Sequence, residues 1–159
     1  MNSKMLIGLA CAVLLVAGLL ALAWSAQSTL ERGLPPRDDS SRSQAAAKKA
    51  AEDWALLNNG GAIHPVRGTG SMAPFIKKTT PDDIVAYAVT QGGATWYEVT
   101  PGALCLYRYG SGNVVAIHCA AKLTSDGWIM SGLSNSRHDI RMNEANFVGI
   151  VARVFIWKS

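Results

Sequence analysis

The feature that most constrains this 159-residue chain is an apolar run over residues 5–23. Seventeen of its 19 residues are hydrophobic, and the two exceptions are Gly8 and Gly18. As a helix that rises about 1.5 Å per residue, the run spans roughly 28 Å, which is close to the thickness of the hydrocarbon core of a bilayer. A helix of a soluble domain normally keeps a polar face, and this run has none. We therefore predict a transmembrane helix over residues 5–23.

The charges on either side of this run predict its orientation. Lys4 and the free amino terminus precede it with no acidic residue, whereas residues of both signs follow it. Under the positive-inside rule, residues 1–4 lie in the cytoplasm and everything after the helix lies on the exported side. Residues 21–23, Ala-Leu-Ala, offer a small-x-small site, so cleavage as a signal peptide is the alternative to an uncleaved signal anchor. The length of the run favours the anchor.

Residues 24–159 have the charge balance of an ordinary globular domain. Without Lys4, this part of the chain contains 14 of the 15 Lys and Arg residues and all 11 acidic residues, which gives a net charge of +3. The basic residues do not form a cluster. We therefore expect no nucleic-acid partner. The histidines and cysteines lack the spacing of a zinc site, and no phosphate-binding glycine loop precedes a helix, so we expect neither a metal nor a cofactor.

Local composition divides the exported part into segments. Residues 24–42 are rich in Ser, Arg, Asp and Pro, which is typical of a tether. Residues 43–57 have high helix propensity and end at Asn-Asn-Gly-Gly, so residues 24–61 are interpreted as a tether and a short helix. Residues 62–159 predict a mainly β domain with a coiled antiparallel or barrel-like sheet. The predicted strands, which are β-branched or aromatic runs, are 84–89, 95–99, 103–109, 114–119, 128–131 and 147–156.

Two cysteines, Cys105 and Cys119, flank a predicted hairpin turn at residues 109–113. A three-residue loop over residues 111–113 would place them directly opposite each other. On an oxidising, exported side they could then pair. Whether the two cysteines form a disulfide or remain free thiols is open, and the two alternatives are equal.

The most informative stretch for chemistry is residues 64–74, His-Pro-Val-Arg-Gly-Thr-Gly-Ser-Met-Ala-Pro. Glycines on both sides of Thr69, with Pro74 close behind, favour an exposed turn that holds the hydroxyl and the backbone N–H of Ser71 toward a cleft. A plain surface turn is the alternative, because Gly and Ser are common turn residues.

Residues 70–74, Gly-Ser-Met-Ala-Pro, resemble the nucleophile box of type I signal peptidases, in which Gly-Ser-Met-x-Pro carries the catalytic serine. Self-cleaving repressors of the SOS type share a related fold and a similar box. Residues 101–108 and 114–118 are similar to the family's pair of strands that leads to the general base. Residues 132–137 are similar to its last box, and residues 144–149 to its closing strand. The resemblance implies Ser71 as the nucleophile, in a β domain that the anchor holds on the outer side of the membrane.

The general base departs from the bacterial pattern. Bacterial enzymes of this type use a neutral lysine, whereas His118 stands at that position here, as in the endoplasmic-reticulum and archaeal branch. A neutral imidazole can accept a hydroxyl proton near pH 7, which predicts activity that rises through roughly pH 6–7. Lys122 is the rival base, but along a strand it lies about 13 Å from His118. The alternative for His118 is a strand histidine that is only hydrogen-bonded in place.

The resemblance leaves two alternatives for a third site residue. Counting forward from Gly132 against the reticulum-type box points to Asp139, whereas counting back from Glu144 against the bacterial box points to Asn135. We prefer Asp139, because a carboxylate can both orient an imidazole and stabilise its cation. A solvated loop acid is the alternative role of Asp139. Leu133 departs from the family, which has an aspartate there.

The expected donors to an oxyanion are the backbone N–H of Ser71 and the hydroxyl of Thr69. Bacterial members of the family often carry a serine at the position of Thr69.

The main hypothesis is a membrane-anchored serine endopeptidase that cleaves exported proteins or signal peptides after small residues, with Ser71, His118 and Asp139 at its site. Its partners would be those substrates and the lipid bilayer. The alternatives are a dedicated maturation protease of a conjugative or phage export system, and a non-catalytic anchored β module that binds a partner.

Overall fold

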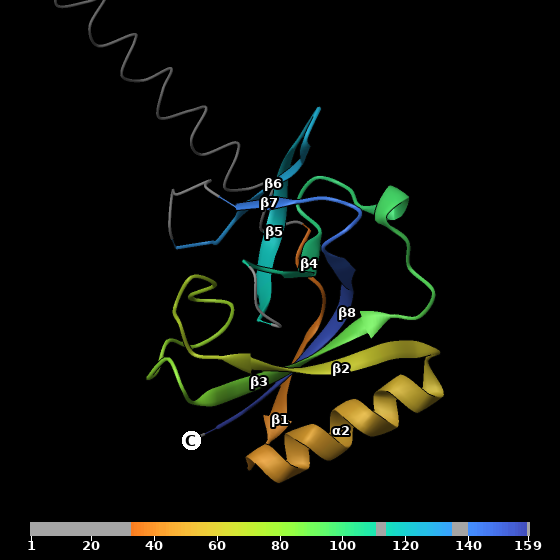
Figure 1. The fold of residues 1–159 in the computed structure, drawn as a ribbon. Helices are drawn as coiled ribbons and strands as arrows, with labels where there is room; N and C mark the ends of the chain where they lie inside the picture. Colours follow the sequence, from red (N-terminus) through yellow and green to blue (C-terminus); the bar gives the residue numbers. More distant parts are fainter. Residues whose placement is uncertain (1–32, 111–113, 135–139, 159) are drawn as a thin grey trace, which may run out of the picture.

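The computed structural model describes residues 33–110, 114–134 and 140–158, and its fold is drawn in Figure 1. The described chain is mainly β, as predicted, with one α-helix, α2 (Gln44–Leu57), and an eight-stranded sheet. The strands are β1 (Arg37–Ser41), β2 (Gly60–Arg67), β3 (Ile84–Gln91), β4 (Leu104–Arg108), β5 (Val115–Thr124), β6 (Gly127–Ser131), β7 (Ile140–Met142) and β8 (Phe147–Trp157).

The strands follow the order β2-β3-β8-β4-β5-β6-β7, and each neighbouring pair in this order is antiparallel. β1 lies off this path and pairs with β8 in parallel. The first residues of β8 pair with β4, and its later residues pair with β3 and β1. Figure 1 shows β8 running from the group that contains β4 to β7 toward the group that contains β1 to β3 and α2. This one long strand therefore joins the two groups.

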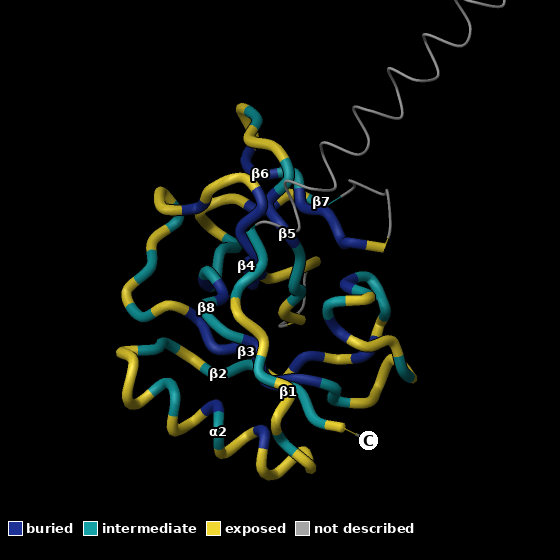
Figure 2. The backbone as a smooth tube through the Cα atoms, turned by 180° about the vertical axis from the view of Figure 1, so that it is seen from behind, coloured by how far each residue is buried: buried dark blue, intermediate teal, exposed yellow. Residues whose placement is uncertain are grey.

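The core that positions the site contains side chains from both groups. Its buried members are Val66, Met72, Ile76, Ala86, Ala88, Leu104, Leu106, Cys119, Leu133, Val151 and Val154. A second cluster lies under α2, where Ala47 and Ala51 pack with Phe155 of β8. Figure 2 shows the buried stretches of α2 on the side that faces the strands. A third cluster surrounds Tyr107 and includes Met130.

Helix α2 forms where its sequence predicts a helix. Ser43 caps its amino end, because the Ser43 hydroxyl accepts a hydrogen bond from the backbone N–H of Ala46 at 3.2 Å. Lys49 and Asp53, one turn apart, form an exposed ion pair. After the helix, Asn59 has a φ of 52°, a left-handed conformation that Asn adopts more readily than most residues. The chain then enters β2.

Some segments differ from the prediction. Residues 37–41, assigned to the tether, form β1, because pairing with β8 uses backbone groups that a polar sequence also carries. Residues 95–99 were predicted as a strand, but they contain the 3-10 helix Trp96–Glu98. There the Glu98 carboxylate accepts hydrogen bonds from the backbone N–H of Thr95 at 2.6 Å and from its hydroxyl at 3.0 Å. β2 and β7 were not among the predicted strands.

The register of the β4–β5 hairpin also differs from the prediction, by one residue. Cys119 lies opposite Leu104, and Cys105 lies opposite His118. A shift of one residue turns side chains to the other face of a sheet, so the two cysteines enter different core clusters. Both are buried free thiols. The expected register, with Cys105 directly opposite Cys119, is therefore wrong, and of the two open alternatives the structure has the free thiols.

The predicted cytoplasmic residues 1–4 and the predicted transmembrane helix over residues 5–23 lie outside the described residues. Within the three described ranges, no helix is both long enough and apolar enough to cross a bilayer.

Candidate active site

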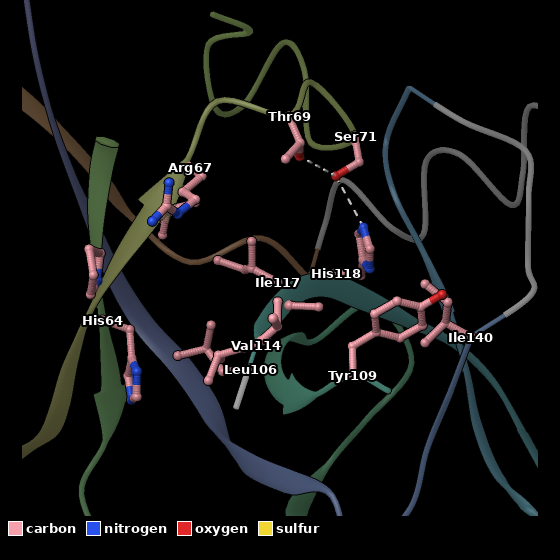
Figure 3. Close-up of a pocket in the computed structure, with 14 residues that line it drawn as sticks. His64, Arg67, Thr69, Ser71, Leu106, Tyr109, Val114, Ile117, His118 and Ile140 are labelled. Atoms are coloured by element: carbon pink, nitrogen blue, oxygen red, sulfur yellow. Dashed lines mark hydrogen bonds between the residues drawn. The ribbon is translucent and has the colours of Figure 1, made fainter. Parts of the chain in front are cut away.

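Ser71 lies in the loop between β2 and β3, at a turn that requires a glycine. Gly70 has a φ of 85°, and a Cβ atom there would lie 2.8 Å from Cδ of Lys78. Met72 is buried and packs into the core beneath the loop. The backbone N–H of Ser134 donates a hydrogen bond to the carbonyl oxygen of Ser71 at 3.1 Å. These contacts fix the backbone of Ser71, while its hydroxyl points toward His118 (Figure 3).

His118 lies on β5 and meets Ser71 across the mouth of the cleft. Its Nε2 atom lies 3.1 Å from Oγ of Ser71, within hydrogen-bond distance. The two residues are 47 positions apart in the sequence, and Figure 3 shows their side chains directed at each other. This spacing suits a nucleophile and its general base.

Thr69 lies on the same loop as Ser71. The two side-chain oxygens are 3.4 Å apart, so the Thr69 hydroxyl lies beside the nucleophile (Figure 3). A hydroxyl at this place can donate a hydrogen bond to an oxygen that becomes negative when the serine attacks a carbonyl.

The other ring nitrogen of His118 has a partner that the sequence did not predict. The hydroxyl oxygen of Tyr107 lies 2.7 Å from Nδ1 of His118. Tyr107 lies on β4 opposite Ala116, two residues before His118, so both side chains are on the same face of the hairpin. The predicted register would have put Tyr107 and His118 on opposite faces, which is why this contact was missed. The correct register alone would have revealed it.

Burial sets the protonation of both groups. It lowers the pKa of His118 below its ordinary value, because the charged imidazolium would lose its water. It raises the pKa of Tyr107 far above its ordinary value, so the phenol keeps its proton. A neutral His118 has a nitrogen lone pair that can accept the proton of Ser71.

A pocket of about 620 Å³ opens beside Ser71 and His118, and Figure 3 looks into it. Its walls come from the end of β2, the β4–β5 hairpin and the first residue of β7. The lining residues besides Ser71 and His118 are His64, Pro65, Val66, Arg67, Thr69, Leu106, Tyr109, Val114, Val115, Ala116, Ile117 and Ile140. A much smaller recess of about 10 Å³ lies against Ser71, Met72 and Ile76. The cleft is mainly apolar, with its polar groups gathered near the serine and along β2.

Asp139 and Asn135, the two alternatives for a third site residue, lie outside the described residues. Lys122, the rival base, is exposed, follows a bulge after Ala120 and is not among the residues that line the pocket. In the part of the chain that the structure describes, no group of three or more His, Cys, Asp or Glu side chains could hold a metal ion.

The class of this site is defined by its geometry, because comparison with known proteins finds no match. No protein-family model, no curated protein and no solved structure matches the chain. The described residues form a site in which a serine hydroxyl contacts a partly buried imidazole at hydrogen-bond distance. A second hydroxyl lies beside the serine, and an apolar cleft opens next to them.

Proposed function

We propose that this protein is a membrane-anchored serine endopeptidase that resembles type I signal peptidases of the endoplasmic-reticulum and archaeal branch. Ser71 is its nucleophile and His118 its general base. The observation that carries the proposal is the distance of 3.1 Å between Oγ of Ser71 and Nε2 of His118. The motif at residues 70–74 supports it as well. In this proposal residues 62–159 form a signal-peptidase-type domain on the exported side, behind an anchor over residues 5–23.

The reaction is an acyl transfer in two stages. His118 accepts the proton of Ser71 at Nε2 while Oγ bonds to the carbonyl carbon of the peptide, and the carbonyl oxygen takes up the negative charge. The backbone N–H of Ser71 and the hydroxyl of Thr69 donate hydrogen bonds to that oxygen. The C–N bond then breaks as His118 passes its proton to the leaving amine. Water then attacks the carbonyl carbon of the acyl-enzyme while His118 accepts a proton from it. His118 passes that proton to Oγ of Ser71 as the ester C–O bond breaks, which releases the acid product and restores the serine.

The recess beside Ser71 supports a preference for small side chains before the cleaved bond. Its volume of about 10 Å³ is close to the smallest that holds one water molecule. A methyl group fits such a space, whereas a larger side chain would have to displace Met72 or Ile76, which belong to the core. Alanine is therefore favoured at this position.

Two strand edges at the pocket support binding of the substrate as an added strand. β2 ends the sheet, with β3 as its paired neighbour, and residues 115–118 of β5 pair with β4 but not with β6. Both segments line the pocket. Backbone N–H and C=O groups at such edges bind an extended peptide. An anchor would hold this cleft near the membrane surface, where exported substrates emerge.

The test uses the full-length protein and a peptide with Ala-x-Ala before the cleaved bond. We expect cleavage by the wild type and none by Ser71→Ala or His118→Ala. Ser125→Ala, at an exposed serine in the β5–β6 turn, is the matched control and should keep full activity. Equal cleavage by the wild type and Ser71→Ala would overturn the proposal.

Two further results would favour the alternatives. Cleavage of a single dedicated protein, without cleavage of the general peptide, would favour a maturation protease. Absence of any cleavage, together with a Ser71 that an acylating inhibitor does not label, would favour an anchored β module that binds a partner.

A further inference from the structure

We infer that Tyr107 orients His118 by accepting a hydrogen bond from its Nδ1–H, and that this site uses a neutral hydroxyl where a serine peptidase commonly uses a carboxylate. The inference rests on the proposed function, in which His118 is the general base. The observation behind it is the distance of 2.7 Å between the Tyr107 hydroxyl oxygen and Nδ1 of His118.

Packing holds the Tyr107 hydroxyl in place. The residue is 0% exposed, and its ring lies in the cluster that contains Trp128, Met130 and Met142. The Tyr107 and His118 rings share one face of the β4–β5 hairpin, with centroids 6.0 Å apart. A ring enclosed in this way cannot move its hydroxyl aside, so the hydroxyl determines where Nδ1 lies.

The direction of this hydrogen bond decides whether His118 can act as a base. If the Tyr107 hydroxyl donated to Nδ1, the ring proton would lie on Nε2, and Nε2 could not accept the proton of Ser71. If Nδ1–H donates to the Tyr107 oxygen, Nε2 presents its lone pair to Ser71. After proton transfer both ring nitrogens carry protons, and Tyr107 can then only accept. The reaction therefore selects Tyr107 as an acceptor throughout.

Tyr107 differs from a carboxylate because it carries no charge. The other titratable or charged side chains that line the described part of the pocket around His118 are His64, Arg67 and Tyr109, and none is a carboxylate. Among the described residues, the group that holds the imidazolium formed in the reaction is therefore the neutral hydroxyl of Tyr107. Burial also keeps the pKa of His118 low, which agrees with this arrangement.

The direct test is the position of the ring proton on His118, measured by two-bond ¹⁵N–¹H NMR on the full-length protein with ¹⁵N-labelled histidine. A His118→Gln variant identifies the His118 signals among those of the three histidines. At neutral pH we expect a protonated Nδ1 and an unprotonated Nε2 in the wild type. In Tyr107→Phe we expect a mixture of both tautomers. A wild type with its proton on Nε2, or an unchanged tautomer in Tyr107→Phe, would overturn the inference.

Kinetics provide the second test. Tyr107→Phe keeps the buried ring and removes one hydrogen bond to a charged imidazolium, so we expect kcat to fall about tenfold to a hundredfold with KM unchanged. Tyr97→Phe, at a tyrosine that is 79% exposed, is the matched control and should behave as the wild type. An unchanged or increased kcat in Tyr107→Phe would contradict the inference.

The two proposals can fail separately. The tautomer measurement on the wild type needs no turnover. Cleavage that persists in Ser71→Ala would remove the peptidase proposal while the tautomer result still decides the role of Tyr107 toward His118.

Discussion

The proton affinity of His118 follows from where its ring lies. Loss of water on burial is the one cause that lowers its pKa, with no contribution from a charged neighbour among the described groups. His64, on the β2 wall of the same pocket, has its pKa lowered for the same reason. Both imidazoles are therefore neutral at pH 7, and only His118 contacts the serine.

The lowered pKa of His118 predicts the pH dependence of cleavage. The base must be neutral, and its pKa in the folded protein lies below the ordinary value of about 6.5. The rate should therefore rise to half its maximum at a pH below about 6.5 and stay level above it. The measurement is kcat/KM for the Ala-x-Ala peptide between about pH 4 and pH 9. A midpoint in the alkaline range would point to a lysine base instead and contradict this assignment.

Thr69 offers a test of the oxyanion site. Thr69→Val keeps the shape of the side chain and removes the hydroxyl that lies 3.4 Å from Oγ of Ser71. We expect kcat to fall about 10²-fold to 10³-fold with little change in KM, because the hydrogen bond forms mainly in the transition state. Thr69→Ser retains a hydroxyl and should retain most of the activity. Normal kcat in Thr69→Val would leave Thr69 as a plain turn residue.

At the scale of elements, composition predicted which segments form strands better than it predicted how they pair. The runs that became β3, β4, β5, β6 and β8 are β-branched or aromatic, and they were recognised for that reason. β1 was not predicted because its side chains are polar and its partner strand, β8, lies far along the chain. The register of β4 and β5 was wrong by one residue, because the backbone N–H of Tyr109 donates to the carbonyl oxygen of Val114, whereas the predicted loop placed Gly110 opposite Val114.

This register predicts two unreactive thiols. In a Cys11→Ala variant, Cys105 and Cys119 are the remaining cysteines, and both are fully buried. Burial raises the pKa of each thiol to about 12, so a thiol reagent at about pH 8 should modify neither in the native protein. Denaturation without a reducing agent should expose both. If the two thiols reacted only after reduction, a disulfide would be present and the register would be wrong.

In the molecule as a whole, β8 joins the two groups of strands. Its residues pair with β1, β3 and β4, and Val151 and Val154 belong to the core cluster that the groups share. Ser71 and His118 come from elements on different sides of this shared core. The geometry of the site therefore depends on the fold of the whole described domain.

This shared strand predicts cooperative unfolding. Met130→Ala removes a side chain that is 1% exposed in the third cluster, and we expect the free energy of unfolding to fall by about 2–5 kcal/mol. Urea transitions followed by circular dichroism and by tryptophan fluorescence should shift together. Leu123→Ala, at a residue that is 57% exposed, should change the free energy of unfolding by less than about 0.5 kcal/mol. Two separate transitions in Met130→Ala would show that the groups unfold independently.

Features that depend on near neighbours along the chain could be predicted from the amino-acid sequence. Helix propensity and the Asn-Asn-Gly-Gly stop predict α2, and Gly70 predicts a turn that presents Ser71. The family resemblance selected His118 as the candidate base. Each of these follows from residue types within one short segment, whose backbone preferences act locally.

Contacts between side chains from distant segments depend on tertiary packing and could not be predicted in this way. Ser71 and His118 lie 3.1 Å apart because the two groups of strands close on a common core. Tyr107 reaches Nδ1 of His118 because of the hairpin register, and the same register separates Cys105 from Cys119. A slip of one residue between two strands turns their side chains to the opposite face, although the amino-acid sequence of each strand stays the same. The choice of register is made by packing across the whole sheet, which no single segment of the sequence contains.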